Sequence, residues 1–266
     1  MPEIAAIVCD LGAELSELDE VVAGLADGDW DLPTPAEGWS IRDQIAHLAF
    51  FDEQATRAVE EPDAFAVALQ EIAADVDGFM NDPLVRARAM APADVLDWWR
   101  AARAAEVAAF DSLDGTDRIP WFGPPMSAAS FVSARIMETW AHGQDIWDAL
   151  GRDRAATSRL KHICHLGVRA RPNSYSARGL TVPEDSVAVV LRGPDGDEWM
   201  WNEGAEQSIT GDALDFCLVV TQRRHLADTA LVSGGRAARE WLEIAQAFAG
   251  PPGSGRKPGQ FAVSAS

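Results

Sequence analysis

The sequence predicts an α+β protein in which a bundle of four main helices precedes a domain that combines helices with a small sheet. In the first 150 residues, apolar side chains recur at steps of three and four, the spacing of one helix face. Beyond Gly151, runs rich in β-branched residues alternate with shorter helical patterns. We therefore expect a helical domain over residues 1–151 and an α+β domain over 152–250. A tail over 251–266, rich in proline, glycine and serine, is expected to be disordered.

The four main helices are predicted over residues 4–25, 41–60, 92–110 and 127–150. Ser40 is a suitable N-cap for the second of them, and Asp43 stands three residues later, where a capping box has an acidic residue. Gly151 follows the fourth helix at a position that favours a left-handed glycine. An accessory helix is expected over 64–80, ending before the next proline. The proline-rich range 115–125 is expected to be a loop.

The second domain contains a hairpin signal. Residues 186–192 and 198–202 are rich in β-branched or aromatic residues, and they flank the turn sequence Pro194-Asp195-Gly196. A third strand is expected over 207–210. Helical spacing predicts further helices over residues 161–171, 214–224 and 235–248.

The composition argues against nucleic acids and membranes as partners. Lys and Arg total 22 against 42 Asp and Glu, which gives a net charge of −20. Such a surface repels phosphate backbones and acidic lipid headgroups. No apolar run reaches membrane-spanning length, and the N-terminus lacks the features of a secretory signal. Three scattered cysteines fit a reducing compartment, so we expect a cytoplasmic protein.

Three residues on two predicted helices form the main candidate site. Glu138 and His142 are four residues apart, so their side chains lie on one helix face, one turn apart. His47 lies in an apolar stretch of the second helix. Two imidazoles and one carboxylate are the ligand set of a catalytic metal that keeps positions open for water or substrate. The alternatives are a surface pair for Glu138 and His142, and a core histidine for His47.

Neighbouring residues are candidates for supporting roles. Asp145 shares the helix face of His142 and could hydrogen-bond the free nitrogen of a ligand histidine, or contact substrate. Asp43 could orient the ring of His47, or could act only as an acid in the first helical turn. Trp121, in the predicted loop before the fourth helix, could form a wall of a pocket.

Rival catalytic motifs are weak. His162 and His165 are three residues apart and could be ligands, but no third ligand is evident near them. The sequence has no nucleophile elbow, no glycine-rich phosphate loop and no dinucleotide fingerprint. Metal chemistry at the first site is therefore the leading hypothesis.

Two segments resemble the signatures of a known family. The first, Gly-Trp-Ser-Ile-Arg-Asp-Gln-Ile-Ala-His-Leu over 38–48, resembles that of the DinB-like helical bundle proteins. It is closest to their actinobacterial branch, the mycothiol-dependent maleylpyruvate isomerase family, whose second signature resembles 138–146 here. The resemblance covers residues 1–151. It implies that the three candidate ligands bind a divalent metal, with zinc expected and nickel, iron or manganese as alternatives.

The second domain more loosely resembles the sterol-carrier-protein-like domain of the same family. Residues 211–216 are similar to a Gly-x-x-x-Asp-Leu segment that leads to a Gly-Arg pair in the family, and the arginine of that pair is catalytic. Here Gln222 stands in place of the glycine. The resemblance therefore makes Arg223 the candidate for contact with substrate and thiol. Alternatively, Arg223 and Arg224 are a basic pair at a helix end.

The ligand set and the resemblance together lead to one hypothesis and three alternatives. We expect an enzyme with mycothiol as cosubstrate, in which a metal-activated thiolate is transferred to a small electrophilic substrate or isomerises it. Asp145 would orient a ligand or move a proton. The alternatives are a metal-dependent hydrolase or rearrangement enzyme, a non-catalytic metal-binding stress or small-molecule-binding protein, and a bundle without metal. The resemblance also allows a homodimer.

Overall fold

The computed structural model describes residues 3–261, in two compact units, Met1–Arg154 and Ala155–Ser266. Helices and a small mixed sheet make up the fold, so the predicted α+β class is confirmed. Of the tail that we expected to be disordered, residues 251–261 follow turns and irregular backbone, and 262–266 lie outside the described residues.

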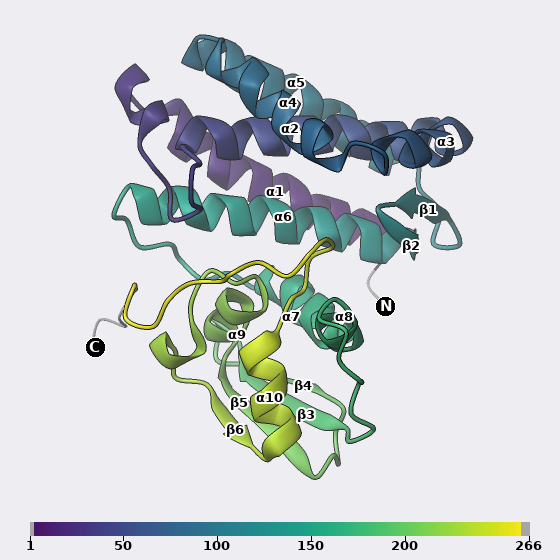
Figure 1. The fold of residues 1–266 in the computed structure, drawn as a ribbon, viewed down its shortest axis with the longest axis vertical. Helices are drawn as coiled ribbons and strands as arrows, with labels where there is room; N and C mark the ends of the chain where they lie inside the picture. Colours follow the sequence, from purple (N-terminus) through teal and green to yellow (C-terminus); the bar gives the residue numbers. More distant parts are fainter. Residues whose placement is uncertain (1–2, 262–266) are drawn as a thin grey trace. The chain divides into compact units, whose positions relative to one another are not determined.

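The N-terminal unit is built around four long helices (Figure 1). They are α1 (Ile4–Ala23), α2 (Ile41–Glu60), α5 (Pro92–Phe110) and α6 (Ala128–Ala149). Helix α2 packs on α5 and α6, and α1 packs on the same two helices. A short 3₁₀ helix, η1 (Asp27–Asp31), lies between α1 and α2. Every predicted end of a long helix is within two residues of the observed end, because apolar spacing and caps define these helices well.

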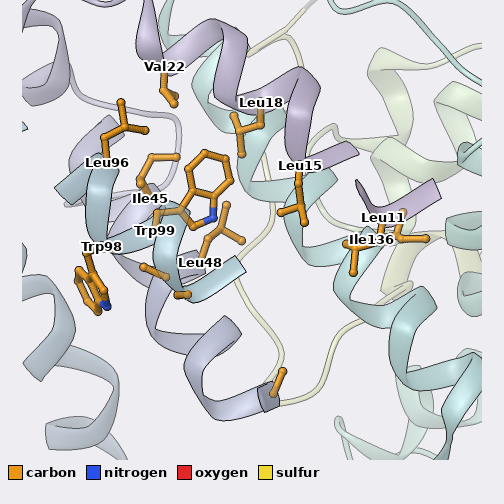
Figure 2. Packing of buried hydrophobic residues seen from close by; sticks show 14 of the residues in the cluster. Leu11, Leu15, Leu18, Val22, Ile45, Leu48, Leu96, Trp98, Trp99 and Ile136 are labelled. Atoms are coloured by element: carbon orange, nitrogen blue, oxygen red, sulfur yellow. The ribbon is translucent and has the colours of Figure 1, made fainter. Parts of the chain in front are cut away.

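The interior of the bundle is a continuous apolar core (Figure 2). Leu11 and Leu18 on α1, Ile45 and Leu48 on α2 and Trp99 on α5 are all completely buried. Burying a side chain of this kind contributes about 1.5–3 kcal/mol. The core therefore packs α2 and α6 together, which matters because these two helices carry the candidate ligands.

The accessory segment forms two helices, so the single helix predicted over 64–80 is wrong. They are α3 (Pro62–Ile72) and α4 (Val76–Arg88). Asp75 starts the second one, because its carboxylate accepts a hydrogen bond of 2.9 Å from the Gly78 N–H. Pro83 lies inside α4 and is buried, so its packing offsets the one backbone hydrogen bond that it cannot make.

The expected loop over 115–125 contains a hairpin instead. Strand β1 (Arg118–Trp121) pairs antiparallel with β2 (Gly123–Ser127). The sequence analysis did not predict this hairpin because its strands contain three prolines, and proline is depleted from strands. They are tolerated here because each strand of a two-stranded ribbon is an edge strand.

The C-terminal unit contains a four-stranded sheet with the strand order β4-β3-β5-β6. Its strands are β3 (Val187–Arg192), β4 (Glu198–Trp201), β5 (Gln207–Asp212) and β6 (Val232–Gly234). The β3–β4 hairpin forms across the predicted turn, β3 and β5 are parallel, and β6 is antiparallel to β5. Strand β6 was not predicted, because three residues are too few to show a period.

The helices of this unit are α7 (Leu160–Arg169), α8 (Arg171–Ser176), η2 (Leu226–Asp228), α9 (Ala213–Val220) and α10 (Arg236–Ile244). Helix α9 packs against α7 and against the sheet strands β3 and β5. Within residues 3–261, none of the helices has both the length and the apolar character that crossing a bilayer requires.

Candidate metal centre

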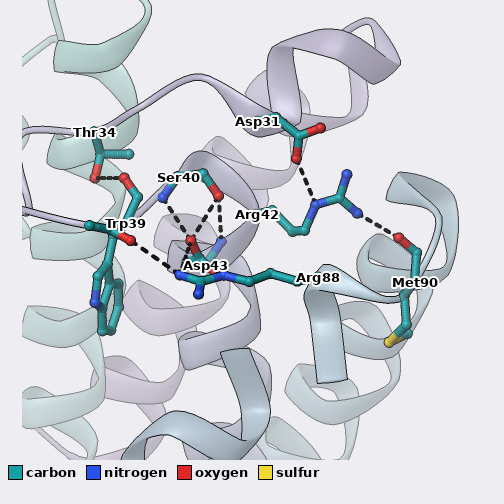
Figure 3. Close-up of polar contacts among 9 residues, drawn as sticks. Asp31, Thr34, Trp39, Ser40, Arg42, Asp43, Arg88 and Met90 are labelled. Carbon is teal, nitrogen blue, oxygen red and sulfur yellow. Dashed lines mark hydrogen bonds and ion pairs between the residues drawn. The ribbon is translucent and has the colours of Figure 1, made fainter. Parts of the chain in front are cut away.

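Polar contacts anchor the start of α2, the helix that carries His47 (Figure 3). Ser40 caps the helix, and its N–H donates to Asp43 Oδ2 at 2.8 Å. Arg88 Nε donates to the other oxygen of Asp43 at 2.9 Å. The Nδ1 atom of His47 has no hydrogen-bond partner among the described residues. Asp43 therefore acts as a cap and ion-pair partner of α2, and it does not orient His47.

Helix α6 brings two further side chains to His47. Its N-cap is Ser127, which accepts a hydrogen bond from the Ser130 N–H. Oε2 of Glu138 lies 3.3 Å from Nε2 of His142, one turn later, and 3.9 Å from Nε2 of His47. One ligand atom from each residue lies within 4.8 Å of the other two. The structure thus brings together the three residues that the sequence predicted as ligands.

Aromatic rings enclose the two imidazoles. The Trp39 ring stacks on His142, with centroids 5.9 Å apart and an interplanar angle of 19°, and lies 5.3 Å from the ring of His47. The ring of Phe51 packs on His47, with centroids 4.5 Å apart. The side chain of His47 is only 10 % exposed and that of Glu138 is 24 % exposed. The site is therefore sheltered yet retains a path to solvent at the carboxylate.

The protonation states suit a cation. Burial and the charge of His142 lower the pKa of His47 to about 4, against the opposing effect of Glu138, so the ring is neutral near pH 7. Burial acts to raise the pKa of Glu138, but the adjacent His142 and His47, together with the charge of Arg135, outweigh it and hold that pKa well below its usual value. A neutral imidazole and an ionised carboxylate are the forms that bind metals.

The donor set fits one divalent cation. Ligand atoms about 2.0–2.2 Å from a shared tetrahedral ion lie roughly 3.3 Å apart, and the observed separations of 3.3 and 3.9 Å are close to that. Among residues 3–261 this is the one group of three or more His, Cys, Asp or Glu side chains with such geometry. His162 and His165 are not part of such a group, and Nδ1 of His165 accepts a hydrogen bond from the Trp201 indole instead.

Gln44 is a site residue that the sequence analysis missed. Its Oε1 atom lies 2.6 Å from Nδ1 of His142, and its side chain is completely buried. We had expected Asp145 in that place. Asp145 is buried one turn beyond His142 on α6. The available signal was the spacing, since Gln44 precedes His47 by three residues and so shares its helix face.

A buried ionic network lies beside the ligands. Arg135 on α6, three residues before Glu138, donates to Asp52 on α2 at 2.7 Å and to Glu106 on α5 at 2.9 Å. All three members of the network are at most 3 % exposed at their side chains. Burial, with the adjacent charge of Asp52, raises the pKa of Glu106 well above its usual value despite Arg135. A proton on Glu106 leaves the network electrically neutral.

Comparison with known proteins identifies the family. Residues 11–147 match the family model of the mycothiol maleylpyruvate isomerase N-terminal domain. The chain belongs to the mycothiol maleylpyruvate isomerase family. Two uncharacterized proteins of Mycobacterium tuberculosis, one from strain CDC 1551 and one from strain H37Rv, are each 46 % identical to it over 257 residues. That alignment covers 96 % of this chain and 100 % of each relative.

Solved structures show the same fold. Crystal structures of a mycothiol-dependent maleylpyruvate isomerase and of its histidine-to-alanine mutant align with this chain at a TM-score of 0.60. The alignment covers 89 % of this chain and 95 % of theirs, at 14 % sequence identity. At that identity the likeness establishes a shared architecture, while function must be argued from the site.

In this member of the mycothiol maleylpyruvate isomerase family, Trp121 lies on β1 and not in a loop. Its ring stacks on Phe65, with centroids 5.7 Å apart, and packs at 5.0 Å against Phe131. Phe51 contacts both Trp121, at 6.3 Å, and His47, at 4.5 Å. Trp121 is therefore one aromatic ring away from His47, a candidate metal ligand.

The segment that carries Arg223 has an unusual backbone. Gln222, just past the end of α9, has a φ of 59°, in the left-handed region that favours glycine. The N–H of Arg223 donates to the Leu218 carbonyl at 2.7 Å, which closes the helix. Gln222 therefore adopts a conformation that favours glycine, and Nε2 of Gln222 donates to the Ala245 carbonyl at 3.2 Å.

Proposed function

We propose that this protein is a metal-dependent enzyme that uses a low-molecular-weight thiol, mycothiol, to attack a small electrophilic substrate. The observation that carries the proposal is the meeting of His47, Glu138 and His142 within 4.8 Å, in a chain of this family. The solved relatives are mycothiol-dependent maleylpyruvate isomerases by name. That supports the choice of thiol, and it favours isomerisation over simple transfer.

The three ligands would hold one divalent cation, with zinc preferred because the donors are two imidazoles and a carboxylate. Such a cation supplies Lewis acidity, and it favours the thiolate form of a thiol whose free pKa of about 8.5 leaves only a few per cent ionised at neutral pH. Three protein ligands leave room for that thiol. A structural zinc site is normally closed by four protein ligands, so the donor count supports catalysis.

The residues around the ligands have distinct tasks in this proposal. Trp39 and Phe51 cover the imidazoles and exclude water from them. Asp145, buried on α6, holds or moves a proton. Trp121, which packs against Phe51, would form one wall of the substrate pocket. The guanidinium of Arg223 would bind the substrate or the thiol.

The chemical steps follow from the thiol. In isomerisation, the thiolate sulfur bonds to an electrophilic alkene carbon, and the electron pair of the alkene moves to the conjugated carbonyl. The former double bond then rotates as a single bond, and the returning electron pair expels the thiolate. In transfer, the proton that the thiol loses on ionisation passes to a carboxylate such as Asp145 and is returned to the adduct, which completes the addition, and the sulfur stays bound.

Thermal unfolding with the thiol tests the proposal. Zinc-loaded protein should melt at a higher temperature in millimolar mycothiol, because a ligand that binds only the folded state stabilises it by mass action. The variant Arg223→Lys should reduce the shift and Arg224→Lys should not. Absence of any shift would reject the thiol and leave metal-dependent hydrolysis as the better function. Turnover of maleylpyruvate separates isomerisation from transfer.

A further inference from the structure

We propose that Gln44 is the positioning residue that fixes the tautomer and orientation of His142, through a directed chain of hydrogen bonds that begins at the backbone carbonyl of Trp39. The proposal rests on the metal-binding part of the proposed function, and it is independent of the thiol and the substrate.

The first link fixes the direction of the chain. The Thr34 hydroxyl donates to the Trp39 carbonyl at 3.0 Å (Figure 3). A carbonyl oxygen accepts and cannot donate, so the single hydroxyl proton of Thr34 is committed to this bond. The Thr34 oxygen can therefore only accept from Gln44, whose amide nitrogen lies 2.9 Å away.

The second link fixes the histidine. Because the amide nitrogen of Gln44 faces Thr34, its carbonyl oxygen must be the atom that lies 2.6 Å from Nδ1 of His142. An amide oxygen only accepts, so Nδ1 of His142 must carry a hydrogen. In the neutral ring, Nε2 then has a free lone pair, and that atom faces Glu138 at 3.3 Å. The chain thus presents the one nitrogen that can bind a cation beside the carboxylate.

The same loop also sets the ring plane. The backbone N–H and the hydroxyl of Thr34 both donate to the Trp39 carbonyl, at 2.8 and 3.0 Å. The indole of Trp39 stacks on His142 at an angle of 19°. One short loop therefore holds His142 through its polar edge and through its face. His47 differs, because its Nδ1 has no partner among residues 3–261 and its ring packs against Trp39 and Phe51.

An amide at this position has a chemical consequence. Gln44 orients the ring without adding charge, so two neutral imidazoles and one carboxylate leave a divalent cation with a net charge of about +1. A carboxylate in place of the amide would make the ring a stronger donor and the cation a weaker Lewis acid. The side chain is completely buried, so its contacts are with protein and not with solvent.

Zinc affinity of the full chain, measured by competition with a chromophoric chelator, tests this role. Gln44→Leu should bind zinc roughly 10- to 100-fold more weakly than the wild type, as expected for loss of an outer contact to a ligand histidine. Gln44→Glu should retain zinc, since it keeps an acceptor for Nδ1. Gln54→Leu on the same helix, at a side chain that lines a surface pocket, should leave the affinity unchanged.

A second pair of variants works where Gln44→Leu fails to fold. Thr34→Val removes the hydroxyl from a half-buried loop position and should weaken zinc binding. Thr34→Ser keeps the hydroxyl and should bind zinc as tightly as the wild type. The visible absorption of bound cobalt should change in Thr34→Val and not in Thr34→Ser. If Gln44→Leu, or Thr34→Val in its place, binds zinc within twofold of the wild type, Gln44 has no positioning role. If the wild type itself binds no zinc, the proposed function fails, and this role with it.

Discussion

The Nε2 atom of His47 on α2 lies 3.9 Å from Oε2 of Glu138 on α6, and this approach of two distant segments creates the site. It requires the two helices to keep a fixed position along each other's length. The apolar core supplies attraction but little precision in that direction. The buried pair of Asp52 and Arg135 joins the same two helices by a directional bond of 2.7 Å.

Arg135→Met should destabilise the protein by about 3–5 kcal/mol, because it leaves Asp52 and Glu106 buried without their cation. Urea unfolding measures the change. Arg57→Met is the matched control, since the ion pair of Arg57 with Glu61 is solvent-exposed and contributes at most about 0.5 kcal/mol. Equal stability of the two variants would show that the network contributes nothing to holding the helices.

Glu106→Gln should become more stable relative to the wild type as the pH rises. The pKa of Glu106 is raised well above 4.5 in the folded state, so above pH 4.5 the folded chain retains a proton that the unfolded chain has lost. The wild type then loses about 1.4 kcal/mol per pH unit until the folded pKa is reached. Glutamine cannot ionise and avoids this loss.

Urea unfolding at pH 5 and pH 8 measures the effect. The difference between Glu106→Gln and the wild type should shift in favour of the variant by about 1 kcal/mol or more between the two values. A constant difference across this range would mean that Glu106 is ionised in the folded protein at both pH values.

Gln222→Gly should fold with a stability within about 1 kcal/mol of the wild type. Glycine removes the strain of the left-handed backbone, and this offsets loss of the hydrogen bond from the Gln222 side chain to the Ala245 carbonyl. Gln222→Val should lose about 2 kcal/mol or more, since a β-branched residue is poorly accommodated at a φ of 59°. Thermal unfolding compares the two. Better tolerance of valine than of glycine would contradict the conformation at this position.

The sequence predicted that His47, Glu138 and His142 come together, because the signals that mark these residues are local and periodic. Glu138 and His142 share a helix face by spacing alone, and His47 follows a capping box that places the start of its helix. The four long helices were predicted for the same reason, since each buries a regular apolar stripe.

Features that depend on contacts between distant segments were missed. Gln44 on α2 contacts His142 on α6, and its spacing of three residues from His47 is too common a pattern to mark an amide as an orienting group. Arg135 and Glu106 look like ordinary surface residues of a helix until packing buries them. The break before α4 depended on one cap, Asp75, which is a weaker signal than a proline.

Zinc titration of the purified chain tests the central claim most directly. The wild type should bind one zinc ion per chain, and His47→Ala should lose more than about 100-fold in affinity, since removal of a ligand exceeds the effect of an outer contact. His165→Ala, which alters a histidine outside the cluster, should bind as the wild type does. Equal zinc affinity of His47→Ala and the wild type would contradict a metal centre built from α2 and α6.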